Sequence, residues 1–286
     1  MDTVIEFKNV TYSYPLTDTP AINALSLSFE KGKFYGIIGE NGAGKTTLCN
    51  LIRGFAPSFY KGELTGEALL YGKPISEYEE GDLALNIGYV FQNPFNQISG
   101  VKDTVFEEVA FGLENFGVPL DEIERRVIDV MKLTNIEHLA EKNPFELSGG
   151  QQQRAALASI IVLEPDILVI DEPTSQLDPE GTESVFEIIS AMKAAKKTII
   201  LVEHKVDLIA EYADEVVVLK AGHVIKNGPT QDVLTDISLL EQGVLLPQVA
   251  VLGSELIKRG VALTYVPVTM DQAVTLLKRA QDKEND

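Results

Sequence analysis

The segment from Gly39 to Thr46 has the spacing G-x-x-x-x-G-K-[ST], which is typical of a loop that binds phosphate groups. Glycines in such a loop let backbone N–H groups turn towards phosphate oxygens, and the helix that follows adds a favourable dipole. Lys45 could reach the β- and γ-phosphates of a nucleotide, and the Thr46 hydroxyl could bind Mg²⁺. The alternative is a glycine-rich turn with a solvated lysine. We favour the phosphate-binding loop because the segment stands between an expected strand and an expected helix.

Two carboxylates, Asp171 and Glu172, follow directly after the apolar run 167–170. Charge at the end of a buried strand is costly unless it serves a purpose. Asp171 could hold Mg²⁺ through water, and Glu172 could polarise an attacking water molecule. Such a pair on its own could be a solvated strand end. Together with the phosphate-binding loop, it predicts a site where phosphate chemistry takes place.

The elements that must position these residues can be read from the apolar pattern. Short β-type runs alternate with turns over residues 4–92, and residues 93–159 show a mostly helical pattern. The runs 167–170 and 198–202 are almost entirely apolar, as expected for strands covered on both faces. A hairpin is expected over 216–225. The alternation of strands and helices predicts an α/β fold with a mainly parallel sheet and right-handed crossovers.

The composition sets limits on the possible functions. The chain has 286 residues, of which 45% are hydrophobic and 23% charged, which is typical of a soluble globular protein. No apolar run is long enough for a membrane span, and no signal peptide is expected at the amino terminus. The one cysteine, Cys49, cannot form an intrachain disulfide.

The chain is strongly acidic, with 43 acidic and 24 basic residues and a formal net charge of -19. Such a surface repels nucleic acids and anionic lipids. We therefore expect no nucleic-acid partner, and we expect any link to a membrane to run through a protein partner.

The segment from Leu147 to Arg154 reads LSGGQQQR and resembles the signature of ATP-binding-cassette (ABC) ATPases. Other elements of that family follow in the expected order along the chain. Gln92 matches the Q-loop glutamine, Asp178 the D-loop aspartate and His204 the switch histidine. The resemblance covers about residues 4 to 230.

This resemblance implies a P-loop NTPase cassette, with a RecA-like mainly parallel sheet, an antiparallel β part and an inserted helical subdomain. Residues 1–92 and 160–230 would form the nucleotide-binding core, and 93–159 the helical subdomain that carries the signature. Residues 231–286 would form a small C-terminal extension that helps two cassettes to pair.

The resemblance also implies ATP and Mg²⁺ as ligands and assigns residues to them. Glu172, His204 and Gln92 would be catalytic, while Thr46, Gln92 and Asp171 would hold Mg²⁺. Tyr14 would stack on the adenine, although Tyr12 is an equally aromatic neighbour. The other ATP-binding residues would be Gly39, Glu40, Asn41, Gly42, Ala43, Gly44, Lys45, Thr46 and Thr47.

In this family two cassettes pair head to tail, and each ATP lies between one phosphate-binding loop and the partner's signature. The residues that would act in trans are Ser148, Gly149, Gly150 and Gln151. The family's activity is the hydrolysis of ATP to ADP and phosphate, coupled in its translocase members to transport across a membrane.

One branch of the family is favoured by local detail. The segments 91–98, 107–112, 115–119 and 246–252 resemble ATPases of energy-coupling-factor importers, which take up vitamins or metal ions. In that branch a second ATPase, a transmembrane coupling subunit and a small membrane protein that binds the substrate complete the complex. The chain would then act as a peripheral protein at the cytoplasmic face of the cell membrane. An ATPase of another transporter class and a non-transport switch protein stay open as alternatives, as do homodimer and heterodimer.

A coupling surface is expected next to Gln92. Residues 95–98 and the helix at 106–111 are predicted to form a groove for the membrane partner, with Glu107 or Glu108 pairing with its arginines. The alternative is that the apolar residues of these segments belong to the core.

Overall fold

The computed structural model describes residues 2–284 of the chain. These residues form two β-sheets with helices packed around them. The larger sheet consists, in spatial order, of β10 (His223–Pro229), β9 (Glu215–Lys220), β3 (Phe34–Ile38), β8 (Thr198–Val202), β7 (Ile167–Asp171) and β6 (Ile87–Val90). Neighbouring strands from β9 to β6 pair in parallel, and β10 pairs antiparallel with β9. The predicted mainly parallel sheet and the predicted hairpin are therefore confirmed. Residues 1, 285 and 286, at the outer limits of the predicted segments, lie outside the described residues.

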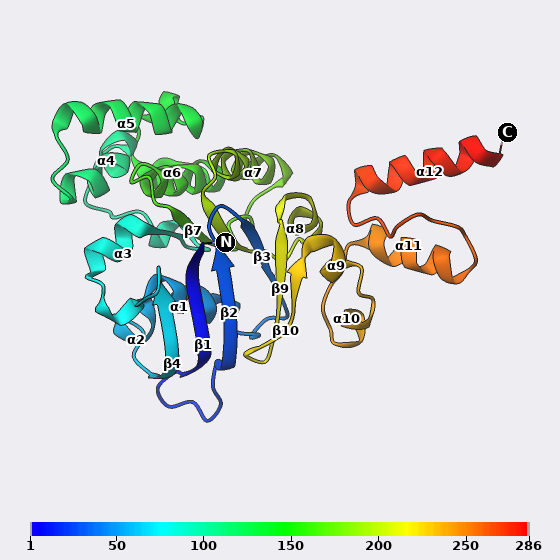
Figure 1. Ribbon diagram of the computed structural model, residues 1–286. Coiled ribbons are helices and arrows are strands. Elements are labelled where there is room, and N and C mark those ends of the chain that lie inside the picture. Colours follow the sequence, from blue (N-terminus) through cyan, green and yellow to red (C-terminus); the bar gives the residue numbers. More distant parts are fainter. Residues whose placement is uncertain (1, 285–286) are drawn as a thin grey trace.

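The smaller sheet is antiparallel and contains, in spatial order, β2 (Ile22–Glu30), β1 (Thr3–Ser13), β4 (Glu63–Leu70) and β5 (Lys73–Pro74). Alternate residues of β2 are buried, which is the pattern of a strand with one face on the core. Figure 1 shows this sheet in blue and cyan beside α1 (Lys45–Arg53), α2 (Phe55–Ser58) and α3 (Glu80–Asn86).

Helix α1 follows the phosphate-binding loop and buries the three residues that the pattern predicts for one face: Leu48, Leu51 and Ile52. Residues in the left-handed conformation flank the helix, because Gly44 precedes it with φ of 102° and Gly54 follows it with φ of 78°. The helix therefore begins at Lys45, the lysine of the phosphate-binding motif.

The segment predicted to be helical contains α4 (Val105–Asn115), α5 (Leu120–Leu133) and α6 (Gly149–Ile161). Helix α6 continues past the predicted end of this segment at residue 159. Figure 1 shows α4 and α5 at the upper left, with α6 and α7 (Pro179–Ala194) between them and the larger sheet. Helix α8 (Val206–Tyr212) follows β8.

The chain beyond β10 forms α9 (Thr230–Leu234), α10 (Ser238–Glu241), α11 (Gln248–Lys258) and α12 (Met270–Glu284). In Figure 1, α11 and α12 extend from the rest of the molecule on the side away from α4 and α5. Several apolar side chains of these two helices are exposed, among them Leu252, Ile257 and Met270. No helix in the described part of the chain is long and apolar enough to cross a membrane.

The interior of the larger sheet is almost completely closed to solvent. Ile199, Ile200 and Leu201 of β8 are each 0% exposed, and β7 is equally buried along its length. Full burial of such a side chain contributes about 1.5–3 kcal/mol. The strands therefore form a stable base, and the loops at their carboxyl ends start from fixed positions.

Candidate nucleotide-binding site

The phosphate-binding loop connects the end of β3 to the start of α1, and two glycines fix its shape. Gly39 has φ of 152° and Gly44 has φ of 102°. A Cβ atom on Gly39 would lie 2.2 Å from the Leu219 carbonyl oxygen, and one on Gly44 would lie 2.6 Å from that of Ala21. Because backbone atoms occupy the space that a side chain would need, only glycine fits at these two positions.

Lys45 occupies the centre of this loop. Its side chain is buried, and its Nζ donates to the carbonyl oxygens of Gly39 and Glu40, each at 3.0 Å. Burial lowers the pKa of Lys45, while the negative charges of Glu172 and Asp171 act in the opposite direction. The loop therefore folds around the Lys45 ammonium group, which two carbonyl oxygens of the loop itself hold in place.

The predicted catalytic residues meet where neighbouring parallel strands end. Because β6, β7 and β8 are adjacent and parallel, their carboxyl ends share one edge of the sheet. Gln92 after β6 donates from Nε2 to Glu172 Oε2 at 2.7 Å, and Nε2 of His204 after β8 lies 2.7 Å from Glu172 Oε1. The structure thus brings Gln92, Glu172 and His204 together through one carboxylate.

Asp171, the last residue of β7, is suited to bind a hard cation. Burial and the neighbouring Glu172 raise the pKa of Asp171, whereas a hydrogen bond with Thr46 and the charge of Lys45 act against that shift. Its Oδ1 atom is buried and has no hydrogen-bond partner within residues 2–284. A buried, unpaired carboxylate oxygen beside the Thr46 hydroxyl is the kind of donor set that Mg²⁺ prefers. Thr46 and Gln92 both line the cavity over the loop, whereas Asp171 lies behind that lining. The residues therefore fit the predicted metal.

The two candidate aromatic residues differ in accessibility. Tyr12 is 0% exposed, and its hydroxyl donates to the carbonyl oxygens of Tyr60 at 2.7 Å and Lys61 at 3.2 Å. Tyr14 is only partly buried, and its hydroxyl lies 3.2 Å from Thr47 Oγ1 in the first turn of α1. Of the two rings, Tyr14 is the one that a base beside the loop could contact.

A cavity of about 680 Å³ lies over the loop. Its lining comes from the loop, from α1, from the segments after three strands and from the residue before β2: Ala21, Asn41, Gly42, Gly44, Lys45, Thr46, Thr47, Gln92, Glu172 and His204. Of the other predicted loop residues, Ala43 is buried. Glu40 is exposed, and its carboxylate packs so closely on Gly243 of the C-terminal extension that a Cβ there would lie 2.0 Å from Oε1.

The signature residues form the start of α6. Ser148 caps this helix, because its Oγ accepts from Gln151 N–H at 3.5 Å while Gln151 Oε1 accepts from Ser148 N–H at 3.1 Å. This reciprocal arrangement is a capping box. Gly149 and Gly150 form the first turn, so the amino end of α6 is open to solvent at small residues.

A separate cavity of about 440 Å³ lies beside the signature. Its lining contains the four signature residues together with residues of the D-loop and of α7, including Asp178. Asp178 caps α7 by accepting from Gly181 N–H at 2.8 Å. The linings of the two cavities have no residue in common. One chain therefore presents a phosphate-binding half and a signature half that face different cavities.

Comparisons with known proteins agree with this geometry. The family described as ABC transporter matches residues 22–175. A Pyrococcus horikoshii protein, named provisionally as an ABC transporter ATP-binding protein, is 41% identical over 279 residues, which is 97% of each chain. This chain belongs to the ABC transporter family.

Further relatives of this ABC protein are more specific in name. The energy-coupling factor transporter ATP-binding protein EcfA2 of Streptococcus sanguinis is 35% identical over 278 residues, covering 96% of this chain and 99% of EcfA2. The solved structure of cbiO1 from Clostridium perfringens, part of the ABC transporter complex cbiONQ, has a TM-score of 0.73 and 34% identity. It covers 85% of this chain and 94% of cbiO1. The predicted cassette fold is therefore confirmed.

A third similar structure is an ATP-binding cassette solved as a dimer in a post-hydrolysis state with ADP and Pi. It has a TM-score of 0.68 and 27% identity, covering 79% of this chain and 98% of that cassette. Membership of this family, together with the assembled site, makes the chain an ABC ATPase subunit of a transporter.

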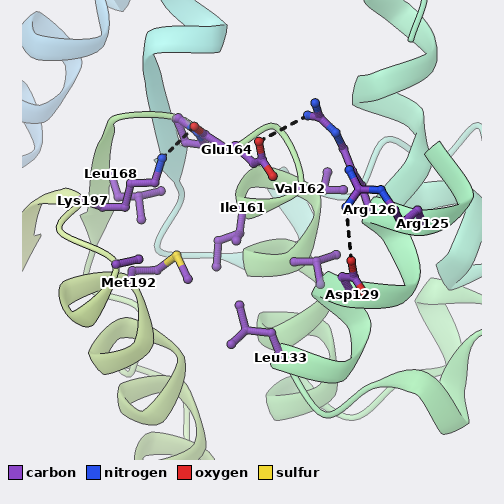
Figure 2. Close-up of a pocket in the computed structure, with 13 residues that line it drawn as sticks. Arg125, Arg126, Asp129, Leu133, Ile161, Val162, Glu164, Leu168, Met192 and Lys197 are labelled. Carbon is purple, nitrogen blue, oxygen red and sulfur yellow. Dashed lines mark hydrogen bonds and ion pairs between the residues drawn. The ribbon is translucent and has the colours of Figure 1, made fainter. Parts of the chain in front are cut away.

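This ABC ATPase has another cavity, of about 220 Å³, between α5 and the far ends of α6 and α7 (Figure 2). Figure 2 shows the basic groups of Arg125, Arg126 and Lys197 near its rim and an apolar interior. Each of the three is already paired with a carboxylate: Arg125 with Asp129, Arg126 with Glu122 and Glu164, and Lys197 with Asp166. The cations are therefore neutralised, in contrast to Lys45 over the phosphate-binding loop.

The predicted coupling surface needs a correction. The prediction that Glu108 faces a partner is wrong, because Glu108 is only 4% exposed and accepts from the Ser99 N–H at 2.7 Å and hydroxyl at 2.8 Å. Ile98 and Phe106 pack in the core, as the alternative interpretation held. Glu107 is exposed and forms a capping box with Thr104 at the start of α4. The apolar pattern could not separate these residues, because core and surface residues alternate within a few positions.

Sequence reasoning placed Phe95 in the predicted coupling surface but missed its aromatic partner, Phe145. Phe95 and Phe145 are 52% and 50% exposed, and their rings stack with centroids 6.5 Å apart. Each follows an Asn-Pro pair whose asparagine side chain accepts from the phenylalanine N–H, at 3.1 Å for Asn93 and 2.9 Å for Asn143. The repeated tripeptide Asn-Pro-Phe was a signal that the two turns have the same shape. The pair connects the segment after Gln92 with the segment before the signature.

Proposed function

We propose that this chain is the ATP-hydrolysing subunit of an energy-coupling-factor importer that takes up a vitamin or a metal ion. The observation that carries the proposal is the match to EcfA2, which extends over 96% of this chain and therefore includes the C-terminal extension as well as the cassette. The similarity to cbiO1, part of the complex cbiONQ, supports the same assignment. An ABC cassette of another transporter class would share the core without requiring this extension.

In the proposed reaction the backbone N–H groups of the loop and Lys45 bind the β- and γ-phosphates of ATP. Thr46, Asp171 and Gln92 would hold Mg²⁺, which neutralises charge on the phosphate oxygens. Glu172 would orient a water molecule and accept its proton as the water oxygen attacks the γ-phosphorus and ADP leaves. Gln92 and His204 each contact one Glu172 oxygen at 2.7 Å. Because each carboxylate oxygen can accept a second hydrogen bond, the water could bind to Glu172 while both partners stay in place.

The proposed active form is a pair of cassettes. The phosphate-binding half and the signature half of one chain face different cavities, so a head-to-tail partner would have to complete each ATP site. Ser148 and Gly150 would contact the γ-phosphate from across the interface, and His204 from the same subunit as Lys45. The partner would be a second copy of this chain or a related cassette.

We further propose that the aromatic pair Phe95–Phe145 takes part in the contact with the transmembrane coupling subunit. Large apolar side chains that are half exposed on a monomer are characteristic of interaction sites. Phe145 lies four residues before the start of α6, and Phe95 lies three residues after Gln92. A membrane subunit that binds there would act on both halves of the nucleotide site.

The test is purification of the tagged full-length chain from detergent-solubilised membranes of its own organism, followed by mass spectrometry. We expect a multi-span coupling subunit and a small membrane protein to copurify, together with a second ABC ATPase if the pair is a heterodimer. A variant with Phe95 and Phe145 both changed to Ala is the matched control and should recover less of the coupling subunit. Recovery of a different transporter class, or of no membrane protein, would contradict the proposal.

A further inference from the structure

Glu203 has a buried carboxylate that forms a second link between the loop of Glu172 and the loop of His204. Glu203 follows the last residue of β8 and is 3% exposed. Its Oε1 accepts from the backbone N–H groups of His204 at 2.9 Å and Lys205 at 3.2 Å. Its Oε2 accepts from the hydroxyl of Thr174 at 2.8 Å, and Thr174 is itself 1% exposed. Two of these bonds hold the backbone of the loop that follows β8, and the third reaches a side chain of the loop that follows β7.

A buried carboxylate such as Glu203 destabilises a fold unless its surroundings compensate for the burial. A carboxylate that is removed from water loses its hydration, and the loss destabilises the fold unless hydrogen bonds replace it. Here three donors converge on Glu203. The bond to His204 N–H fixes the backbone from which the imidazole extends towards Glu172.

Thr174 connects this carboxylate to the other loop. It lies two residues after Glu172, whose own N–H donates to the Val202 carbonyl oxygen at 2.9 Å. The Leu177 N–H then donates to the Thr174 carbonyl oxygen at 3.2 Å, which anchors the turn that leads to Asp178. The same residue therefore touches the base-bearing loop and the start of the D-loop.

We propose that Glu203 is a positioning residue that holds His204 within reach of Glu172 and the γ-phosphate and connects it to the segment 174–178. The contact to the γ-phosphate rests on the proposed function. Glu203 does not touch the nucleotide cavity, since its side chain is absent from the lining that the described residues form. A movement of His204 would therefore be transmitted through Glu203 and Thr174 to the D-loop. The D-loop belongs to the face that would pair with a second cassette.

The first test compares Glu203→Ala with Glu203→Gln in the purified full-length chain with its copurifying subunits. Glu203→Ala leaves two backbone N–H groups without their acceptor, so kcat should fall about 10- to 100-fold while the KM for ATP changes less than about 3-fold. Glu203→Gln keeps an oxygen for both N–H groups and an amide for the Thr174 hydroxyl. Its kcat should stay within about 3-fold of the native value.

The second test uses isosteric variants in case Glu203→Ala fails to fold. Thr174→Val removes one hydroxyl bond to Glu203 and should lower kcat by about 3- to 10-fold. Thr134→Val is the matched control, because Thr134 is 0% exposed and its hydroxyl donates to the Val130 carbonyl oxygen at 2.8 Å, on α5. It should lower the Tm by a similar amount and leave kcat unchanged.

Two results would overturn the inference. One is native turnover in folded Glu203→Ala, and the other is an equal loss of turnover in Glu203→Ala and Glu203→Gln, which would point to charge instead of position. Glu172→Gln is measured in the same preparations to separate this inference from the proposed function. If Glu172→Gln still turns over ATP, the proposed chemistry fails. If Glu172→Gln is inactive but Glu203→Ala turns over ATP at the native rate, only the positioning role of Glu203 is wrong.

Discussion

The two halves of the proposed ATP site are built in different ways. The phosphate-binding half stands on four neighbouring strands, and its loop is closed by Gly39 and Gly44 and filled by Lys45. The signature half is the exposed amino end of one helix, held by the reciprocal bonds of Ser148 and Gln151. The groups of the first half already contact one another within the chain. In the proposed head-to-tail pair, the second half would gain most of its contacts from the partner.

This difference separates two kinds of effect that a substitution can have. A change in the sheet-based half should alter binding or chemistry in a single cassette, because the groups involved already touch one another. A change in the signature half should leave nucleotide binding by one chain intact and affect only the closed pair. The predictions below test this separation, in order of decreasing expected effect.

The largest effect is expected for Glu172→Gln. The amide keeps the bonds to Gln92 or His204 but cannot accept a proton from water, so turnover should fall by about 10²-fold or more. ATP binding, measured by titration with a fluorescent analogue, should stay close to native. A turnover near the native rate in the assembled transporter would remove Glu172 from its proposed role. Both cassettes of a heterodimer must carry the change.

A smaller loss is expected for Ser148→Arg, which places bulk and charge against the partner's nucleotide. Overpacking of a fitted contact costs about 1–3 kcal/mol, which corresponds to roughly 5- to 150-fold in the closed pair. ATP binding by the separate chain should persist. In a mixed dimer, Lys45→Ala and Ser148→Arg on the same subunit should inactivate both sites, while one fully active site would contradict head-to-tail pairing.

Tyr14→Ala should weaken ATP binding by about 10-fold, because an aromatic ring stacked on a base contributes about 1–3 kcal/mol. Stacking acts equally on the ground state and the transition state, so kcat should change less than the dissociation constant. Tyr12→Phe is the control and should affect thermal stability without affecting ATP binding, since Tyr12 is buried and bonded to Tyr60. A raised ATP dissociation constant in Tyr12→Ala, together with an unchanged one in Tyr14→Ala, would move the adenine contact to Tyr12.

The smallest effect is expected for Phe95→Ala. Loss of one ring from an interface hot spot costs more than about 1 kcal/mol, so transport by the assembled complex should fall about 5-fold or more. ATP binding by the separate chain should not change. Phe116→Ala, at another exposed phenylalanine, serves as the comparison. Equal transport by the two variants would exclude the aromatic pair from the coupling contact.

The sequence predicted the fold and the phosphate-binding half because both depend on local signals. Apolar runs defined β7 and β8, and the spacing from Gly39 to Thr46 defined the loop. The signature half was recognised only through its family resemblance. Glu203 and Phe145 were missed, since each depends on contacts between segments far apart in the chain. Glu108 was misplaced because an acidic residue on a helix is usually solvated, and here it is buried against Ser99.

The contact of Glu40 with Gly243 joins the C-terminal extension to the loop that carries the motif lysine. The neighbouring Gln242 carbonyl accepts from Lys220 Nζ at 2.8 Å, which ties the same stretch to the end of β9. Residues 242–243 therefore pack on the phosphate-binding loop and on the strand beside it. A chain shortened after β10 would lose this support for the loop, so shortened cassettes are unsuitable standards for the kinetics of the whole protein.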